Sequence, residues 1–169
     1  MWTNKGTQRP PHAEEPAHGQ ESVWDYPRPP KLMADGRLVE VHSGEQLIVR
    51  SNKNYRICET ASPPTFYIPP DQIDWSLLKH IEGGSYCEWK GLARYWSLKS
   101  DPTLPVAWSY PKPRALFSRI ANLVSFYPGR VSCTVDGQQV RAQPGGFYGG
   151  WITDEIVGPF KGDPGTGHW

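Results

Sequence analysis

The chain has 169 residues, of which 37% are hydrophobic and 12% aromatic, and a formal net charge of +1. A chain of this length can bury enough surface to fold as one domain without disulfides. The balanced charge argues against a nucleic-acid partner, and the lack of a basic cluster argues against binding to a membrane surface. No apolar run approaches the roughly 20 residues of a transmembrane helix, so no membrane partner is predicted.

The three cysteines, Cys58, Cys87 and Cys133, are odd in number and widely spaced. Such a set is a poor disulfide framework and suits a reducing compartment. Neither the cysteines nor the five histidines show Cys-x-x-Cys or His-x-x-x-His spacing, so no metal site is predicted. Residues 1–11 contain no apolar stretch typical of a signal peptide. We therefore expect a cytoplasmic protein.

The N-terminal part of the chain changes character at residue 23. Residues 1–22 are polar and rich in Pro, His and Glu, which predicts a disordered or loosely attached arm. Residues 23–30 combine aromatic residues with prolines that hold the backbone extended. Trp24 and Tyr26 are costly to leave in water, so we expect them to hold this segment, the strap, against the domain.

The central part of the chain, residues 23–142 including the strap, is predicted to form a β-rich core domain. Short runs of alternating, β-branched or aromatic residues separated by Gly, Pro, Asn and Asp predict about eight short strands. The strand-like segments are residues 37–42, 46–50, 55–59, 65–68, 86–90, 93–98, 106–110, 123–127, 131–135 and 139–142. The dipeptide Asp136-Gly137 is typical of a tight hairpin turn between two of them.

Two short helices are predicted within the core, over residues 70–79 and 115–123. Pro70 and Asp71 form a helix-start signal. Apolar residues recur at helical spacing in both segments: Ile73, Leu77 and Ile81 in the first, and Leu116, Ile120 and Leu123 in the second. Together these elements predict a mostly β (α+β) fold, a curved sheet arrangement resembling a tent or barrel. The strands follow one another too closely for repeated crossover helices, which disfavours a doubly wound parallel sheet.

The C-terminal tail, residues 143–169, is rich in glycine and still aromatic, so we expect it to pack back on the core. Its segment Gly158-Pro159-Phe160-Lys161-Gly162 is not a phosphate loop, because that motif ends in Gly-Lys-Ser/Thr and opens a helix. We expect Phe160 to anchor the tail by packing, and Lys161 to be solvated or ion-paired.

Several sequence blocks stand in a fixed order along the chain: Cys58-Glu59-Thr60, Tyr67-Ile68-Pro69-Pro70-Asp71, Cys87-Glu88-Trp89-Lys90-Gly91, Trp108-Ser109-Tyr110-Pro111 and Gly158-Pro159-Phe160-Lys161-Gly162. Together they resemble a bacterial family labelled domain of unknown function 427, in its longer form common in cyanobacteria. The resemblance covers nearly all of residues 24–169. Shorter members often read Cys-Pro-Phe-Lys-Gly where this chain has Glu88 and Trp89. The resemblance implies a compact, tent-like β fold and no established reaction.

The same family also carries a nucleotidyltransferase label, which the residues of this chain do not support. Such enzymes place a Gly-Gly or Gly-Ser turn upstream of an Asp-x-Asp or Asp-x-Glu pair that holds divalent metal. The segment Gly83-Gly84-Ser85 could form the turn, but no such acid pair follows it. The nearest pair of aspartates, Asp71 and Asp74, lies upstream in the predicted first helix.

Cys87 and Glu59 are the candidate catalytic residues. In a strand, Cys87 and Trp89 would share one face, and Glu88 and Lys90 the other. A cation near Cys87 would favour a reactive thiolate, whereas the alternative is a buried cysteine beside a cross-strand ion pair. Glu59 could serve as a buried base, or it could pair with a neighbour such as Arg56.

An aromatic set spread over four predicted strands is the candidate ligand-binding site: Tyr67, Trp89, Tyr95, Trp96, Trp108 and Tyr110. Clustered aromatics with a few polar groups commonly line small-molecule pockets, and the alternative is an aromatic core. We expect Trp89 or Trp96 to stack on the ligand, and Lys90 and Glu59 to fix its polar end.

The leading hypothesis is therefore a small-molecule-binding β domain whose ligand and cofactors are unknown. Two alternatives remain open at this point. One is an enzyme of unknown reaction that uses Cys87 or Glu59. The other is an interaction scaffold that presents its proline-rich strap and glycine-rich tail to a partner. A homodimer is left open separately, as is the question whether strap and tail pack on their own chain or are swapped between protomers.

Overall fold

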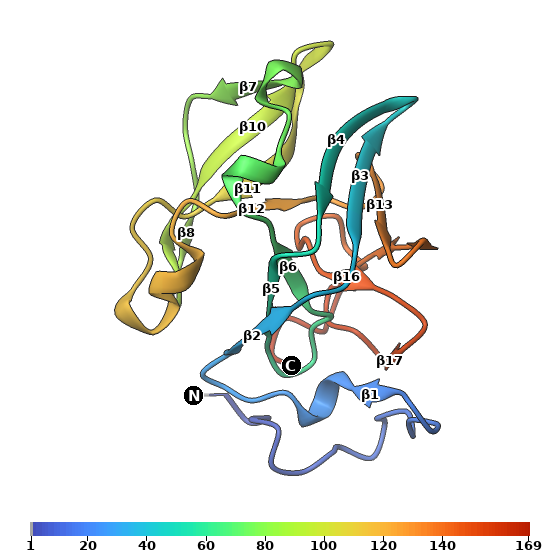
Figure 1. Ribbon diagram of the computed structural model, residues 1–169. Coiled ribbons are helices and arrows are strands. Elements are labelled where there is room, and N and C mark those ends of the chain that lie inside the picture. Colours follow the sequence, from blue (N-terminus) through green and yellow to red (C-terminus); the bar gives the residue numbers. More distant parts are fainter. Residues whose placement is uncertain (1) are drawn as a thin grey trace.

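The computed structural model describes residues 2–169, which form short strands and 3-10 turns (Figure 1). A four-stranded antiparallel sheet has the order β12-β11-β10-β7. Its strands are β7 (Leu78–Ile81), β10 (Arg94–Leu98), β11 (Asp101–Ser109) and β12 (Val124–Phe126). In this sheet Tyr95 lies opposite Trp108, and both residues line the cavity described below.

A second four-stranded antiparallel sheet packs beside the first, in the order β14-β13-β3-β4. Its strands are β3 (Val39–Ser43), β4 (Gln46–Ser51), β13 (Ser132–Val135) and β14 (Gln138–Gln139). The expected turn between β13 and β14 is confirmed, because Asp136 and Gly137 both have positive φ, 47° and 80°.

The remaining strands form one three-stranded sheet and three two-stranded pairs. The three-stranded sheet consists of β2 (Lys31–Asp35), β5 (Asn54–Cys58) and β6 (Thr65–Tyr67) in the order β2-β5-β6. The pairs are β1 (Glu21–Ser22) with β17 (Ile156–Val157), β8 (Tyr86–Cys87) with β9 (Gly91–Leu92), and β15 (Arg141–Ala142) with β16 (Trp151–Ile152). The structure contains more strands than the eight or so expected. These pairs account for much of the difference, because strands of two residues leave no periodic pattern in a sequence.

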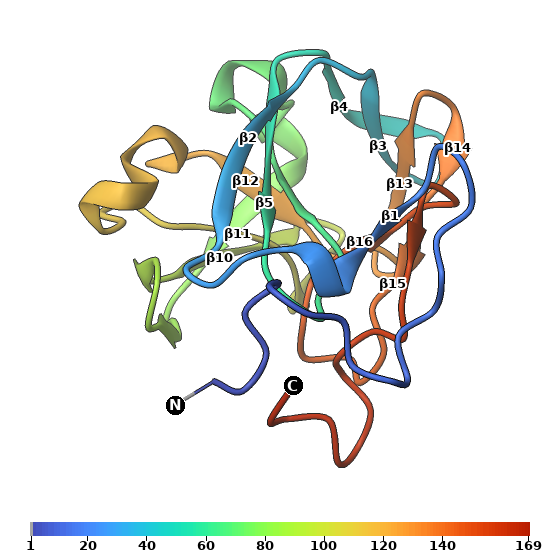
Figure 2. The same cartoon turned by 90° about the horizontal axis from the view of Figure 1, so that it is seen from below.

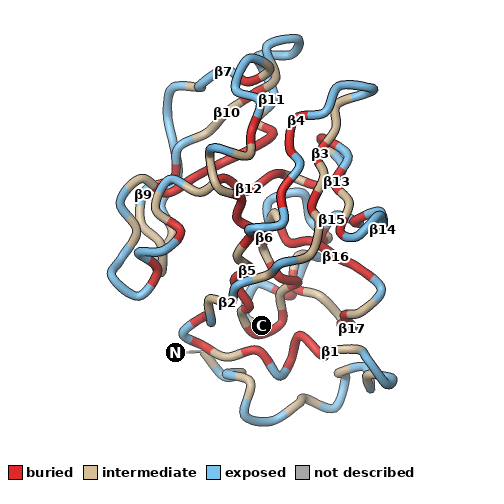
Figure 3. Tube along the Cα trace, viewed as in Figure 1, coloured by how far each residue is buried: buried red, intermediate tan, exposed pale blue. Residues whose placement is uncertain are grey.

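The main core lies where the sheets meet (Figure 3). Val39 and Val41 alternate inward on β3, as the period of a strand requires. Phe66 of β6 stacks on Trp151 of β16 with ring centroids 4.8 Å apart. The indole N–H of Trp151 donates to the carbonyl of Phe126 at 2.9 Å, so this large ring is buried with its polar atom satisfied.

The prediction of two short helices is not confirmed. Residues 70–81 form two single 3-10 turns, η2 (Pro70–Gln72) and η3 (Trp75–Leu77), and then strand β7. The amide of Asp74 donates to Ile48 of β4 at 2.8 Å, so the chain is pulled to the sheet before a helix can continue. Residues 115–120 form only the 3-10 segment η4 (Ala115–Ile120), which Phe117 interrupts with non-helical backbone angles.

The mostly β architecture is confirmed, but the barrel-like alternative is wrong because the sheets do not close on one another. Helical spacing of apolar residues over seven or eight positions is weak evidence, and pairing with a neighbouring strand overrides it here. No helix within residues 2–169 has the length and apolar character needed to cross a membrane.

The two ends of the chain lie side by side against the three-stranded sheet (Figures 1 and 2). Trp24, in the 3-10 turn η1 (Val23–Asp25), is buried with Cys58 and Ile156. Upstream, the amide of Glu14 donates to Gly158 at 2.9 Å, and the ring of His12 stacks on Trp169 at 5.0 Å. The first and last segments thus form one layer over the end of the core.

Candidate functional site

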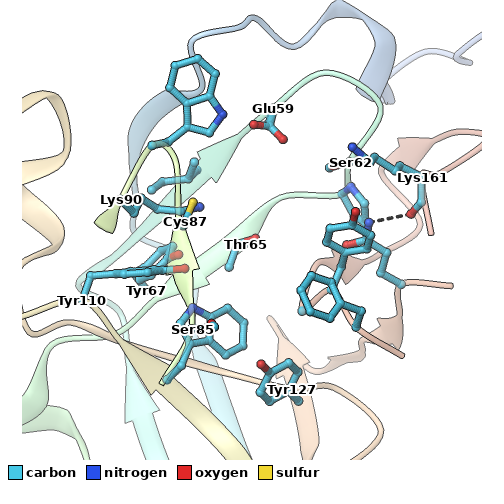
Figure 4. Close-up of a pocket in the computed structure, with 18 of the residues that line it drawn as sticks. Glu59, Ser62, Thr65, Tyr67, Ser85, Cys87, Lys90, Tyr110, Tyr127 and Lys161 are labelled. Carbon is cyan, nitrogen blue, oxygen red and sulfur yellow. Dashed lines mark hydrogen bonds between the residues drawn. The ribbon is translucent and has the colours of Figure 1, made fainter. Parts of the chain in front are cut away.

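A cavity of about 500 Å³ opens beside this terminal layer (Figure 4). Strands β5, β6 and β11 form its floor through Ile57, Tyr67 and Trp108. The β8–β9 hairpin forms one wall, and the C-terminal segment around residues 146–149 with Lys161 forms another. The site is therefore built from segments far apart in the sequence.

The floor of the cavity is aromatic. Tyr67, Trp108 and Tyr110 are all buried, and the rings of Tyr67 and Tyr110 lie 6.5 Å apart. Trp108 packs against Tyr127 with ring centroids 4.5 Å apart. A Cβ atom on Gly149 would lie 2.1 Å from the Trp108 ring, so only glycine fits above this indole. The floor thus offers flat apolar surface to a ring-shaped ligand.

Within residues 2–169 the hydroxyl group of Tyr67 makes no hydrogen bond of ordinary geometry although the residue is 0% exposed. Burial raises the pKa of this phenol, and an interaction with the Trp108 side chain lowers it only in part, so the group is neutral and can both donate and accept. An unpaired buried hydroxyl destabilises the fold by about 1–3 kcal/mol. A polar group that sits in this cavity would be the natural partner.

Lys161 enters the cavity from the C-terminal side (Figure 4). Its backbone is fixed at both ends, because its amide donates to Ala61 at 2.8 Å and its carbonyl accepts from the Gln143 side chain at 2.6 Å. The side chain is 6% exposed. Within residues 2–169 no carboxylate lies within ion-pair distance of its ammonium group, so the expectation of a solvated or ion-paired lysine is wrong.

Two effects lower the pKa of Lys161: burial first, and then the positive charge of Arg28. Arg28 is itself only 8% exposed and donates to three main-chain oxygens, those of Asn4, Thr60 and Trp169, at 2.6–3.1 Å. Burial also lowers the pKa of Arg28. Both cations contact the Trp2 ring, Arg28 at 4.0 Å and Lys161 at 4.5 Å. Two buried cations therefore share one aromatic ring, and neither pairs with an Asp or Glu side chain within residues 2–169.

The hairpin wall differs from the strand expected for residues 86–90. Strand β8 ends at Cys87 and β9 begins at Gly91, so residues 88–90 form the connecting turn. Strand alternation does not apply in a turn, and Cys87, Glu88, Trp89 and Lys90 all line the cavity instead of facing opposite sides. The Lys90 ammonium lies 5.7 Å from the Tyr110 ring centroid.

The cavity gathers eight of the candidate residues, namely Glu59, Tyr67, Cys87, Trp89, Lys90, Tyr95, Trp108 and Tyr110. Trp96 is the exception. It follows Tyr95 on β10, so it points to the other face of that strand. There its ring lies 5.4 Å from Trp75 and 5.8 Å from His80, and it packs against the main core.

Sequence reasoning missed several contributors to the cavity, among them Trp2, Arg130, Tyr148 and Lys161. Trp2 lies in the segment expected to be a loose arm, although a tryptophan in a polar arm is itself an unusual residue. For Lys161, the only indication of a role in the sequence was its position within one of the ordered blocks. Asp71 and Asp74, the nearest acid pair, do not line the cavity, and Asp74 caps the turn η3 by accepting from the amide of Ser76.

Among residues 2–169 no group of three or more His, Cys, Asp and Glu side chains converges as a metal site would require. No curated protein matches the chain. A family model described as domain of unknown function (DUF427) matches residues 31–137. The match includes most of the cavity floor and the β8–β9 hairpin, but not Trp2, Arg28, Tyr148 or Lys161. Since the match covers more than half of the chain, the protein belongs to this family, domain of unknown function 427.

Proposed function

We propose that the protein binds a small organic molecule in the aromatic cavity. The observation that carries this proposal is the cavity of about 500 Å³, whose lining combines the buried rings of Tyr67, Trp108 and Tyr110 with the ammonium groups of Lys90 and Lys161. Ligand sites usually fall between about 300 and 1,000 Å³ and combine apolar walls with a few polar groups. A cavity of this kind supports binding more than it supports a filled aromatic core.

The proposed roles follow from where each side chain lies. Trp108 and Tyr110 supply the flat surface, and Trp89 covers the ligand from the hairpin. Tyr67 hydrogen-bonds a polar atom of the ligand, while Lys90 and Glu59 contact its polar end nearer the mouth. Trp96 has no role in this proposal, because it lies on the opposite face of β10.

Native mass spectrometry of the gently purified protein tests the proposal directly. We expect a stoichiometric adduct that is lost on mild activation, and we expect less of it in the Tyr67→Phe variant. Tyr55→Phe, which changes a tyrosine outside the cavity lining, is the matched control. A bare mass in every preparation, together with no binding from a library of aromatic fragments, would reject the proposal.

A second candidate function is an enzyme that uses Cys87 or Glu59, since both line the same cavity. Thiol labelling as a function of pH separates this candidate from a binding protein. Cys58 and Cys133 serve as internal controls: both are fully buried, and burial raises the pKa of the Cys58 thiol to about 11. An apparent Cys87 pKa near the free value of about 8.5 argues against a thiolate nucleophile.

A further inference from the structure

The charged groups around the cavity do not neutralise one another. Three cations line it, Lys90, Arg130 and Lys161, against two acids, Glu59 and Glu88. None of the five forms an ion pair within the described chain. With Arg28 behind Lys161, the lining has an excess of positive charge that is concentrated on the C-terminal side.

We propose that the ligand of this cavity carries an anionic group, a carboxylate or a phosphate, and that this group binds at the Lys161 ammonium while the ring of the ligand lies on the aromatic floor. This inference rests on the proposed function, and it adds the chemical class of the ligand and the residue that selects it.

The position of Lys161 favours this role over a structural one. A buried ammonium without a counter-ion opposes folding, and contacts with the Trp2 and Tyr148 rings, at 4.5 and 5.7 Å, replace only part of its hydration. Its main-chain hydrogen bonds to Ala61 and Gln143 hold the segment in place without any help from the side chain. The main-chain bonds therefore hold Lys161 at the cavity, and its ammonium group donates to no atom of residues 2–169.

The neighbouring groups also favour an anion. Arg130 lies in the same lining, where it donates to the carbonyls of Pro105 and Gly146 at 2.8 and 3.2 Å and contacts no acid. Glu59 and Glu88 are partly or fully exposed, so water screens their charge more than that of Lys161. A cationic ligand would bring a third positive charge next to Lys161 and Arg28.

The probes for the test are matched sets built on the same ring: phenylacetate, phenyl phosphate, phenylacetamide and phenethylamine, with the corresponding indole-3-acetate, indole-3-acetamide and tryptamine. Binding to the full chain is measured by ligand-observed NMR and by calorimetry. We expect the acids to bind more tightly than the amide, and the amine to bind least. The carboxylate and phosphate members show which anion the site prefers.

Lys161→Met should weaken binding of the acids by about ten- to hundredfold, the effect of one lost charge-assisted hydrogen bond, and leave the amide unchanged. Lys161→Arg should restore part of the preference for acids. Lys53→Met, at an exposed turn, is the charge-matched control. Competition by inorganic phosphate against the acids, but not against the amide, tests the same point in the unmodified protein if Lys161→Met does not fold.

The two proposals fail in different ways. If amide and acid bind equally, and neither Lys161→Met nor phosphate changes the binding of the acid, the cavity binds ligands but the anion subsite is rejected. If no member of any set binds to the unmodified protein, the proposed function is rejected together with the anion subsite.

Discussion

Two neighbouring regions of the protein differ in whether their arginine and lysine side chains are paired with Asp or Glu. At the junction of β1, β2 and β5, Arg56 pairs with Glu21 at 2.9 Å, and Arg37 pairs with Asp35 at 2.7 Å and with Glu155. Around the cavity, Arg28 and Lys161 are at least as buried and pair with no Asp or Glu side chain within residues 2–169, and Arg28 instead donates to main-chain oxygens that include the one of Trp169.

This difference distinguishes the structural role of the paired cations from the binding role that we propose for the unpaired one. A buried cation that is matched by carboxylates joins segments, and here the pairs tie the N-terminal strand β1 and Glu155 to the three-stranded sheet. A buried cation without a paired carboxylate carries a desolvation penalty, which at Lys161 the ring contacts and the charges of Glu59 and Glu88 offset only in part. Such a group is expected where a ligand supplies the missing charge.

The largest expected effect comes from breaking the matched cluster. Arg56→Met removes the cation that pairs with Glu21, and because Glu21 is partly exposed we expect the free energy of unfolding to fall by about 2 kcal/mol, less than for a fully buried pair. Lys161→Met should cause no loss of stability, because it removes an uncompensated charge. Urea denaturation of both variants measures the contrast, and equal losses would remove the distinction between the two regions.

Acid should weaken the cluster of paired charges around Arg37 and Arg56. Hydrogen bonding to Arg56 lowers the pKa of Glu21, and at Asp35 the hydrogen bonds from Arg37 outweigh burial and also lower the pKa. The unfolded chain therefore takes up protons first, and stability falls as the pH drops below the ordinary carboxyl values of 4.5 and 3.8. Unfolding free energies measured across this range should show a shallower acid slope in Arg56→Met than in the unmodified protein.

Tyr67→Phe removes the buried hydroxyl and with it the cost of burying a polar group that makes no well-formed hydrogen bond. The free energy of unfolding should therefore stay unchanged or rise by up to about 1 kcal/mol. The same change should weaken ligand binding. Thermal unfolding with and without ligand separates the two effects. A clear loss of stability in the ligand-free variant would mean that the hydroxyl has a structural partner.

The smallest expected effect is an alkaline one at Lys161. Because its pKa is lowered in the folded protein, the unfolded chain holds this proton to higher pH. The stability of the unmodified protein should therefore rise relative to Lys161→Met as the pH approaches the ordinary lysine value of 10.5. Arg28 strengthens the effect, while Glu59 and Glu88 weaken it. Paired denaturation curves would show a constant difference if the ammonium were fully solvated.

Much of the cavity could be found from sequence because its aromatic residues lie on short strands with clear patterns. Tyr67, Trp108 and Tyr110 are large rings with polar tips, and the tight spacing of the strands predicts that they meet. Trp96 fitted the same description, but the period of a strand places it on the opposite face from Tyr95. Sequence composition does not show which of two adjacent rings faces a cavity, because that choice depends on the position of β10 in its sheet.

The sequence by itself determined a mostly β protein with a Trp- and Tyr-rich centre, because alternation, β-branched residues and turn dipeptides act over a few neighbouring positions. Only the tertiary structure decided that residues 70–81 pair with a sheet instead of forming a helix, and that Trp2 and Lys161 meet at one cavity. The physical reason is that strand pairing and burial arise between separate segments, β7 with β10 in the first case and Trp2 with Lys161 across nearly the whole chain in the second, and no local pattern records such contacts.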